Sequence, residues 1–443
     1  MNLMPQISPH LLSFISPRHG SNAWAQRRDI LAAWQRGSQG EVRPMTLEYA
    51  PILACNADCY GCPYRRSRLH AGSGMVAPGA VALEDDIQAA TPETAQRVLD
   101  AAYEGGVRGV LWTGGGEPTI WAPLLAMLAY STQLGMLNAL YTNGFVLGRD
   151  PDYAHHVLAP ASGLVFVRMS INAVTPRVVK RHWGVEPDEV RLQLAGLVRL
   201  LEARNRLLPM YHEQRLRVPS IQISTIIDRQ NVGDLLGICE TVAAIFAHYR
   251  EVQGDEDRCI VRPMTYHGRS RYSVRDHADE VIQQIIEVCG TAGRGRRALA
   301  DAGVDLFMGF GLPLVEAGGV PTYSAVLEST YAERDVSLAT GLFLIVGPNG
   351  AVYLSTEHNC SDDTWSFGNL KDQSVEEVYR SERRRQLLDY ANVHRWGPDV
   401  AQPTSRTARL DRIAKAVSQR MLSAEDLEQI RQLSLASHVL ILD

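Results

Sequence analysis

Three cysteines lie within eight residues, at Cys55, Cys59 and Cys62, in the spacing C-x3-C-x2-C directly after the apolar run 45–53. Thiolates this close together are typical ligands of an iron–sulfur cluster or of zinc. A structural zinc site usually has four protein ligands, and no fourth cysteine lies nearby. The spacing therefore favours a [4Fe-4S] cluster with one iron open to a substrate or cofactor.

The same three cysteines could instead be core thiols, because positions i, i+4 and i+7 share one face of a helix. The residues between and after them argue against a buried helix, since Asn56, Asp58 and Pro63 lie among or beside them. Seven cysteines in a chain of this length indicate a reducing compartment. The remaining four stand singly in the sequence, as inert core thiols do: Cys239, Cys259, Cys289 and Cys360.

A glycine-rich segment, Thr-Gly-Gly-Gly-Glu-Pro at 113–118, follows a second apolar run. Glycines at such a place let the backbone approach a bound molecule closely. A tight turn between a strand and a helix would use the same residues, so this segment alone is a weak signal.

With both motifs in this order, the chain resembles the radical S-adenosylmethionine (SAM) superfamily over about residues 42–300. The resemblance implies a [4Fe-4S] cluster on the three cysteines, with SAM chelating the open iron and its methionine moiety held by Gly114, Gly115, Gly116 and Glu117. The position before the third cysteine is often aromatic in this family. Here it is Gly61, with Tyr60 one place earlier, which changes the usual contact to adenine.

The resemblance also points to SAM-binding positions where later strands end. We expect Asn143, Ser170, Asn172 and Ser224 near the SAM ribose, and Arg262 near the SAM carboxylate or the substrate. Each could instead cap the following helix or, for Arg262, form a surface ion pair.

Alternating strand-like and helix-like runs begin at residue 42, which is typical of a parallel sheet with crossover helices. We predict strands at 42–50, 109–113, 137–142, 164–172, 221–227 and 259–264. Helices are predicted at 92–105, 124–134, 187–204, 231–249 and 280–291. This order predicts an α/β fold, a partial (β/α)6 TIM-like barrel, and the resemblance implies the same architecture.

Beyond residue 300 we predict a strand at 303–308, a β-hairpin over 342–355 with Asn349-Gly350 at its turn, and a helix at 375–388. This order resembles the C-terminal SPASM or twitch extensions of the superfamily, which bind auxiliary clusters through several cysteines. Only Cys360 is present here, so we expect an extension without an auxiliary cluster. The predicted divisions are a lead-in at 1–40, a radical SAM core at 41–300, the extension at 301–400 and a helical tail at 401–443.

The composition excludes some partners. The 443 residues are 45% hydrophobic and carry a formal net charge of -5, so a polyanionic partner such as nucleic acid is not expected. No apolar run approaches 18 residues and the N-terminus lacks the order of a signal peptide. We expect a cytoplasmic protein with no membrane association.

The resemblance implies that an electron from the reduced cluster cleaves SAM to a 5′-deoxyadenosyl radical, which removes a hydrogen atom from the substrate. The candidates for subsequent proton transfer are Glu357, His358, Tyr266 and His182, each of which could equally be an ordinary surface or structural residue. The basic segment 63–68 could dock a flavodoxin- or ferredoxin-type electron donor, or could simply be solvated.

In length and layout the chain is most similar to the radical SAM diol-dehydratase type of aminoglycoside antibiotic biosynthesis, as in apramycin formation. This implies a carbon–oxygen lyase that dehydrates a sugar or aminoglycoside, with an NAD(P)H-dependent reductase as a possible partner. The alternatives are a radical SAM sugar epimerase, deaminase or dehydrogenase, a peptide-modifying maturase, or a non-catalytic protein that binds zinc or a cluster.

Overall fold

The computed structural model describes residues 44, 46–59, 62, 89–251, 257–263, 278–308, 343–354 and 366–393, to which every structural statement below refers. Several predicted features lie outside these residues. They are the lead-in 1–40, the tail 401–443, the basic segment 63–68, and Tyr60, Gly61, Tyr266, Glu357, His358 and Cys360.

The described strands form one sheet in which the first seven follow chain order and all run parallel. These are β1 (Thr46–Tyr49), β2 (Gly109–Trp112), β3 (Leu137–Thr142), β4 (Leu164–Ser170), β5 (Ser220–Ile227), β6 (Arg258–Pro263) and β7 (Asp305–Met308). The carboxyl ends of neighbouring parallel strands therefore meet along one edge. The α/β class with a parallel-dominated sheet is confirmed.

The C-terminal strands continue the same sheet on its other side. β8 (Phe343–Val346) pairs in parallel with β1, and the antiparallel strands β9 (Ala351–Tyr353) and β10 (Ser366–Asn369) follow it. The predicted hairpin at 342–355 is confirmed, and its turn contains Gly350 with φ of 83°. The hairpin thus lies next to β1, a pairing that the sequence does not indicate.

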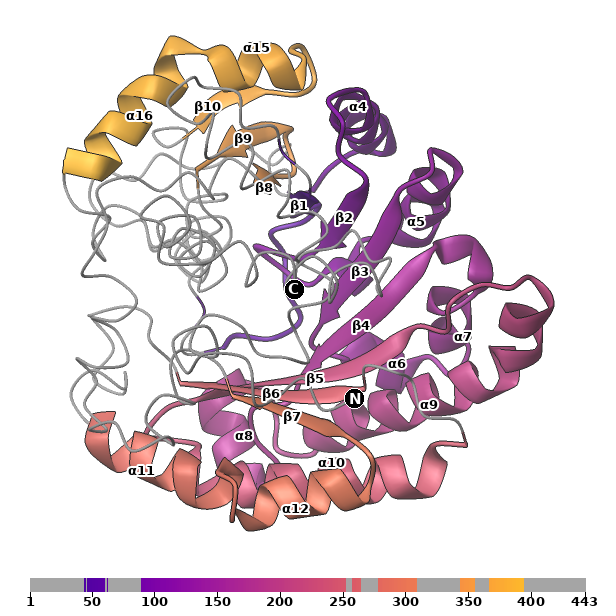
Figure 1. Ribbon diagram of the computed structural model, residues 1–443, viewed down its shortest axis with the longest axis vertical. Coiled ribbons are helices and arrows are strands. Elements are labelled where there is room, and N and C mark those ends of the chain that lie inside the picture. Colours follow the sequence, from indigo (N-terminus) through magenta and orange to yellow (C-terminus); the bar gives the residue numbers. More distant parts are fainter. Residues whose placement is uncertain are drawn as a thin grey trace, which may run out of the picture.

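Helices cover one side of the curved sheet, as Figure 1 shows. After β1 come α4 (Pro92–Glu104), α5 (Leu124–Gln133), α6 (Phe145–Arg149), α7 (Tyr153–Val157), α8 (Pro176–Trp183), α9 (Glu189–Glu213), α10 (Leu235–Tyr249), α11 (Ala278–Cys289), α12 (Arg294–Asp301), α15 (Val375–Arg380) and α16 (Glu382–Val393). Short 3-10 turns are η4 (Pro118–Ile120), η5 (Pro160–Ser162) and η6 (Val232–Asp234). The predicted start of α4 is confirmed, because the Thr91 side chain accepts a hydrogen bond from the Thr94 N–H and Pro92 is the first helical residue.

The helix predicted at 375–388 is instead two helices, α15 and α16, because the backbone of Ser381 between them is extended. Two further predicted bounds are wrong because of contacts distant in sequence. The strand predicted at 164–172 ends at Ser170, and the Asn172 side chain accepts the Ile226 N–H where a backbone carbonyl would continue the ladder. The helix predicted at 187–204 continues to Glu213 through Pro209. Buried Leu207 and Tyr211 hold this extra length against the core, which outweighs the helix-breaking tendency of proline.

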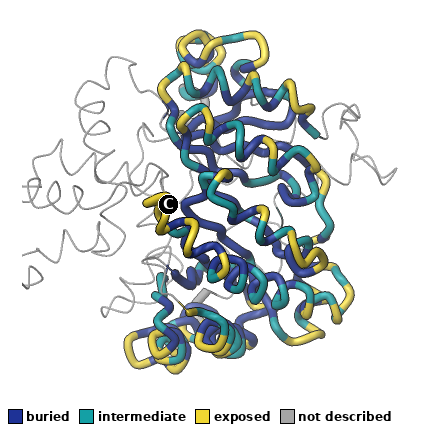
Figure 2. Tube along the Cα trace, turned by 90° about the vertical axis from the view of Figure 1, so that its right-hand side faces the viewer, coloured by how far each residue is buried: buried dark blue, intermediate teal, exposed yellow. Residues whose placement is uncertain are grey.

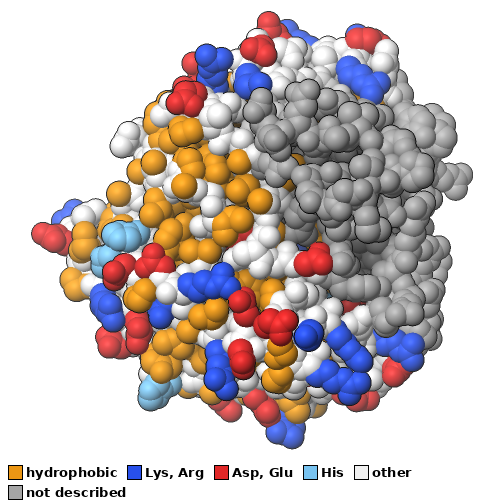
Figure 3. All heavy atoms as spheres, turned by 180° about the vertical axis from the view of Figure 1, so that it is seen from behind, with side chains coloured by type: hydrophobic (Ala, Val, Ile, Leu, Met, Phe, Trp, Pro, Cys, Tyr) orange, Lys and Arg blue, Asp and Glu red, His pale blue; other side chains and the backbone are white. Residues whose placement is uncertain are grey.

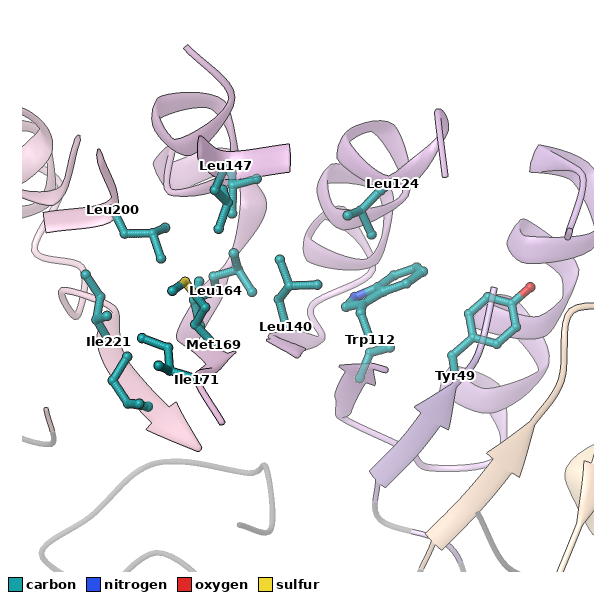
Figure 4. Close-up of a cluster of buried hydrophobic side chains, with 14 of the residues drawn as sticks. Tyr49, Trp112, Leu124, Leu140, Leu147, Leu164, Met169, Ile171, Leu200 and Ile221 are labelled. Atoms are coloured by element: carbon teal, nitrogen blue, oxygen red, sulfur yellow. The ribbon is translucent and has the colours of Figure 1, made fainter. Parts of the chain in front are cut away.

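The main core fills the space between sheet and helices. Side chains of alternate strand residues point toward the helices, including Tyr49, Trp112, Leu140, Met169 and Ile221 (Figure 4). Figure 2 shows the consequence along the chain, with the strands buried and the outer turns of the helices exposed.

One segment, Val232–Tyr249, has the length and apolar composition of a membrane span, and 44% of it is buried inside the protein. Its buried apolar residues belong to the main core. On the face drawn in Figure 3, acidic and basic side chains are interspersed. This agrees with the small net charge.

An ion pair without solvent contact links α9 to the residue before β6. The Arg204 guanidinium donates two hydrogen bonds, of 2.6 and 2.8 Å, to the Asp257 carboxylate, and the two side chains are 1% and 0% exposed. Asp257 also accepts the Ile221 N–H at 2.8 Å.

We predict that Asp257→Ala lowers the free energy of unfolding by about 3–5 kcal/mol, because it removes the carboxylate that neutralises a buried guanidinium. Glu240→Ala is the control. It breaks the exposed pair with Arg294 and should cost at most about 1 kcal/mol. Denaturant unfolding of the two variants checks this, and equal losses would contradict it.

Candidate functional site

The cysteines lie on the segment 53–62, here called the cysteine loop, which leaves β1 at its carboxyl end. Cys55, Cys59 and Cys62 are each partly exposed, and the Cys62 N–H donates to the Cys59 carbonyl at 3.2 Å. Ligands of α/β sheets bind at this edge, where loops converge. The loop therefore presents three thiols at the place where a cofactor is expected.

The glycine-rich segment after β2 holds the cysteine loop directly. The Glu117 N–H donates to the Ala54 carbonyl at 3.0 Å. A Cβ on Gly116 would lie 2.0 Å from that same oxygen, and one on Gly114 would lie 2.0 Å from the Gly116 oxygen. Two of the glycines that were expected at the SAM site are thus also required for close backbone contacts within the protein.

The Glu117 side chain is 3% exposed and joins the ends of β2 and β3. Its carboxylate accepts hydrogen bonds from Thr119 (N–H and hydroxyl), from the Thr142 hydroxyl at 2.7 Å and from the Asn143 N–H at 2.7 Å. Burial raises the pKa of Glu117, and these hydrogen bonds counteract the rise in part. The four donors are those that a carboxylate requires away from water.

A second contact holds the cysteine loop from the other side. The Asp58 N–H donates to the Trp183 carbonyl at 2.9 Å, where α8 ends. Gly184 follows with φ of 64°, and a Cβ there would lie 2.6 Å from the Asp58 oxygen. The Trp183 ring packs edge-on against Phe145 in a small apolar cluster that Cys55 and Cys59 flank.

The donor set fits a [4Fe-4S] cluster. Within the described residues, no three His, Cys, Asp or Glu side chains converge on a point suited to a single metal ion. A cubane does not need such convergence, because each thiolate binds a different iron. Two buried donors beside the thiols, Asn56 Nδ2 and Trp183 Nε1, make no hydrogen bond within the described residues. Buried donors normally have a hydrogen-bond acceptor, and a bound anionic group would supply one.

The structure brings together only part of the predicted site. Cys55, Asn56, Glu117 and Asn143 form one connected group, since Asn143 Nδ2 lies 2.6 Å from Asn56 Oδ1 and 3.8 Å from Cys55 Sγ. Ser224 accepts a hydrogen bond from Arg262 at 2.9 Å on β5 and β6. The Asn172 side-chain oxygen accepts a hydrogen bond from the Ile226 N–H on β5. The Ser170 carbonyl accepts from Gln193.

Sequence reasoning missed two residues of this group. Thr119 binds the Glu117 carboxylate, and Gln193 donates to the Asn143 and Ser170 carbonyls at 2.8 Å. Thr142, which the sequence places at the end of a strand next to Asn143, also binds the Glu117 carboxylate. Gln193 lies within α9 with no local signal, because its partners are 23 and 50 residues away.

Cys239, Cys259 and Cys289 are fully buried, as predicted. Although they stand singly in the sequence, they lie together in the fold. A hydrogen bond with Cys239 and burial raise the pKa of the Cys289 thiol, and burial raises that of Cys259.

His182 is 3% exposed and faces Asp228, with Nε2 3.7 Å from Oδ2. Neither ring nitrogen has a hydrogen-bond partner within the described residues. Burial lowers the pKa of His182 to about 4 and raises that of Asp228 to about 6. Between about pH 4 and pH 6 the folded pair therefore holds one proton on Asp228, whereas the unfolded chain holds it on His182.

We predict that Gly116→Ala lowers the free energy of unfolding by about 1–3 kcal/mol, because its methyl group overlaps the cysteine loop. Gly233→Ala is the matched control, since nothing lies within 4 Å of a Cβ there, and its stability should stay within about 0.5 kcal/mol of wild type. Denaturant unfolding compares them, and two equally stable variants would refute the steric argument.

A second prediction concerns pH. Below pH 6.5 His182 binds a proton in the unfolded chain but not in the folded chain, which lowers the free energy of unfolding. Asp228 has the opposite effect, because it binds a proton in the folded chain but not in the unfolded chain. These effects nearly cancel in wild type. In Asp228→Asn only the histidine effect remains, so the free energy of unfolding at pH 5 should be about 2 kcal/mol lower than at pH 7. Adding His182→Gln should abolish that excess loss, and its persistence would contradict the assignment.

The comparisons with known proteins agree with this geometry. Residues 49–204 match the model of the radical SAM superfamily. A search of curated proteins gave no match. Streptococcus suis SuiB bound to the precursor peptide SuiA is 14% identical, with 81% of this chain and 70% of that chain covered and a TM-score of 0.51. SuiB bound to S-adenosylmethionine is 13% identical, with 82% and 72% covered and a TM-score of 0.51.

BtrN in complex with AdoMet and 2-DOIA is 12% identical over 81% of this chain and 92% of that chain, with a TM-score of 0.31. The SuiB likeness, at this identity, shows a shared fold. The superfamily uses a [4Fe-4S] cluster and SAM, as the two motifs predicted. The chain therefore contains a radical SAM superfamily domain, which is matched over residues 49–204.

Proposed function

We propose that this protein cleaves SAM reductively and abstracts a hydrogen atom from a carbon of a sugar or aminoglycoside. The neighbouring hydroxyl group then leaves as water, and the carbonyl radical that remains takes up a second electron from the electron donor and a proton. One observation gives the strongest support for the cleavage of SAM. The three thiols of the cysteine loop lie at the carboxyl end of β1, held in place by the glycine-rich segment after β2.

In this proposal Cys55, Cys59 and Cys62 hold the cluster. When bound, the cluster supplies the electron that splits SAM into methionine and a 5′-deoxyadenosyl radical. The protein's own residues then position the substrate and exclude water. Glu117 and Trp183 fix the backbone of the cysteine loop on its two sides.

A hydroxyl-rich substrate is supported by the face of the sheet that lacks the main core. On β4, Val167 and Met169 join the core, so Arg168 between them points to the opposite face. Its guanidinium donates to the Tyr141 hydroxyl and to Gln222 Oε1. The Ser224–Arg262 pair on β5 and β6 adds further polar groups. Such groups suit a substrate that offers many donors and acceptors.

We also propose that the sheet is a partial barrel and that residues 301–400 are a SPASM- or twitch-like extension without a cluster. Cys360 is the only cysteine after residue 300, and one thiol cannot hold a cluster. A peptide-modifying maturase would usually carry several cysteines there, so we rank it second. The remaining partners in the proposal are a flavodoxin- or ferredoxin-type electron donor and a reductase acting on the product.

The test begins with protein prepared anaerobically with iron and sulfide. We predict about four irons per chain and formation of 5′-deoxyadenosine from SAM after reduction, with both reduced to background in Cys59→Ala. Zinc in place of iron, with no SAM cleavage, would refute the proposal and favour a non-catalytic protein.

The same preparation tests the substrate. With aminoglycoside precursors deuterated at single positions, the label should appear in 5′-deoxyadenosine for one position, and the product should have lost water. Label in 5′-deoxyadenosine together with a sugar product that retains every hydroxyl would favour an epimerase, deaminase or dehydrogenase. Label transfer from a peptide alone would favour a maturase.

A further inference from the structure

Directly after β3, the Asn143 side chain contacts the cysteine loop. It is 6% exposed, and hydrogen bonds to three neighbours hold it. Its N–H donates to Glu117 at 2.7 Å and its carbonyl accepts from Gln193 at 2.8 Å. Its side-chain oxygen accepts the Phe145 N–H at 3.1 Å. Asn143 therefore has little freedom to rotate.

These contacts decide which end of the amide faces the thiols. A backbone N–H can only donate, so the Asn143 atom facing Phe145 must be the oxygen. The NH₂ group then points to the cysteine loop, where one of its two hydrogens reaches Asn56 Oδ1 at 2.6 Å. The same nitrogen lies 3.8 Å from Cys55 Sγ, within reach of an N–H···S hydrogen bond.

We propose that Asn143 is a positioning residue whose amide donates a hydrogen bond to the Cys55 thiolate and thereby raises the reduction potential of the cluster. This inference rests on the proposed function. Hydrogen bonds to the sulfurs of an iron–sulfur cluster are among the factors that set its potential. Reduction adds negative charge to the cluster and its thiolates, so a donor aimed at one of them stabilises the reduced form more than the oxidised form.

The most informative variant is Asn143→Asp. It has nearly the same shape and keeps an oxygen for the Phe145 N–H, but it offers the thiolate a negative oxygen where the wild type offers a donor. We expect the equilibrium for reduction to become at least about tenfold less favourable, a shift of about 59 mV to more negative potential for one electron. Asn143→Leu removes the donor without adding charge and should shift the potential in the same direction by a smaller amount.

Asn205→Leu is the control, because Asn205 is also partly buried and its amide donates to the Tyr249 carbonyl on α10 and not to the cysteine loop. Its potential should equal that of wild type. The potentials are measured by redox titration followed by electron paramagnetic resonance, without SAM or substrate, so the result does not depend on turnover.

A direct measurement covers the case in which a variant does not fold. Wild-type protein labelled with ¹⁵N in asparagine side chains should show a nitrogen hyperfine coupling at the reduced cluster, and Asn56→Ala should retain it. Absence of the coupling in wild type, or unchanged potentials in both loaded Asn143 variants, would overturn the inference. Failure of the wild type to bind a cluster would instead refute the proposed function, so the two failures are distinguishable.

Discussion

The site depends on one buried carboxylate. Glu117 accepts hydrogen bonds from Thr119, Thr142 and Asn143, and its own N–H binds the carbonyl of Ala54. Transferring a carboxylate from water to the protein interior is costly unless donors replace the water. Here the donors come from the turn after β2 and the end of β3. A correctly formed sheet edge is therefore a condition for burying Glu117, and a buried Glu117 fixes the cysteine loop that leaves β1.

The loop is fixed by backbone contacts on both sides, which explains where glycine is required. Gly116 on one side and Gly184 on the other both approach loop carbonyls more closely than any side chain would permit. Thiol ligands on a loop would otherwise sample many arrangements. Because the two contacts involve main-chain atoms, they place the backbone of the cysteine loop through the packing of β2 and α8.

The sequence contains enough local information to predict most of the fold. Strand and helix periods, the cap at Thr91 and the Asn349-Gly350 turn are short-range signals, and each gave an element that the structure contains. Long-range pairings were not predictable in this way. Examples are β8 beside β1, the use of Asn172 by β5 and the continuation of α9 through Pro209, since each depends on residues far away in the chain. At the site, spacing predicted the three cysteines and the family resemblance predicted Glu117, but neither predicted Thr119, Gln193 or the orientation of Asn143.

The two faces of the sheet differ in what they contribute. The face toward the helices is apolar and holds the strands in register, as Trp112, Leu140 and Met169 illustrate. On the opposite face Arg168 is already bonded to Tyr141 and Gln222. A side chain held by these hydrogen bonds cannot move far toward a ligand, so its positive charge stays at one place. Specific placement of a reactive radical requires such rigidity, because a hydrogen atom is removed from whichever carbon lies nearest. The same polar network that would recognise a substrate would therefore also select the carbon that reacts.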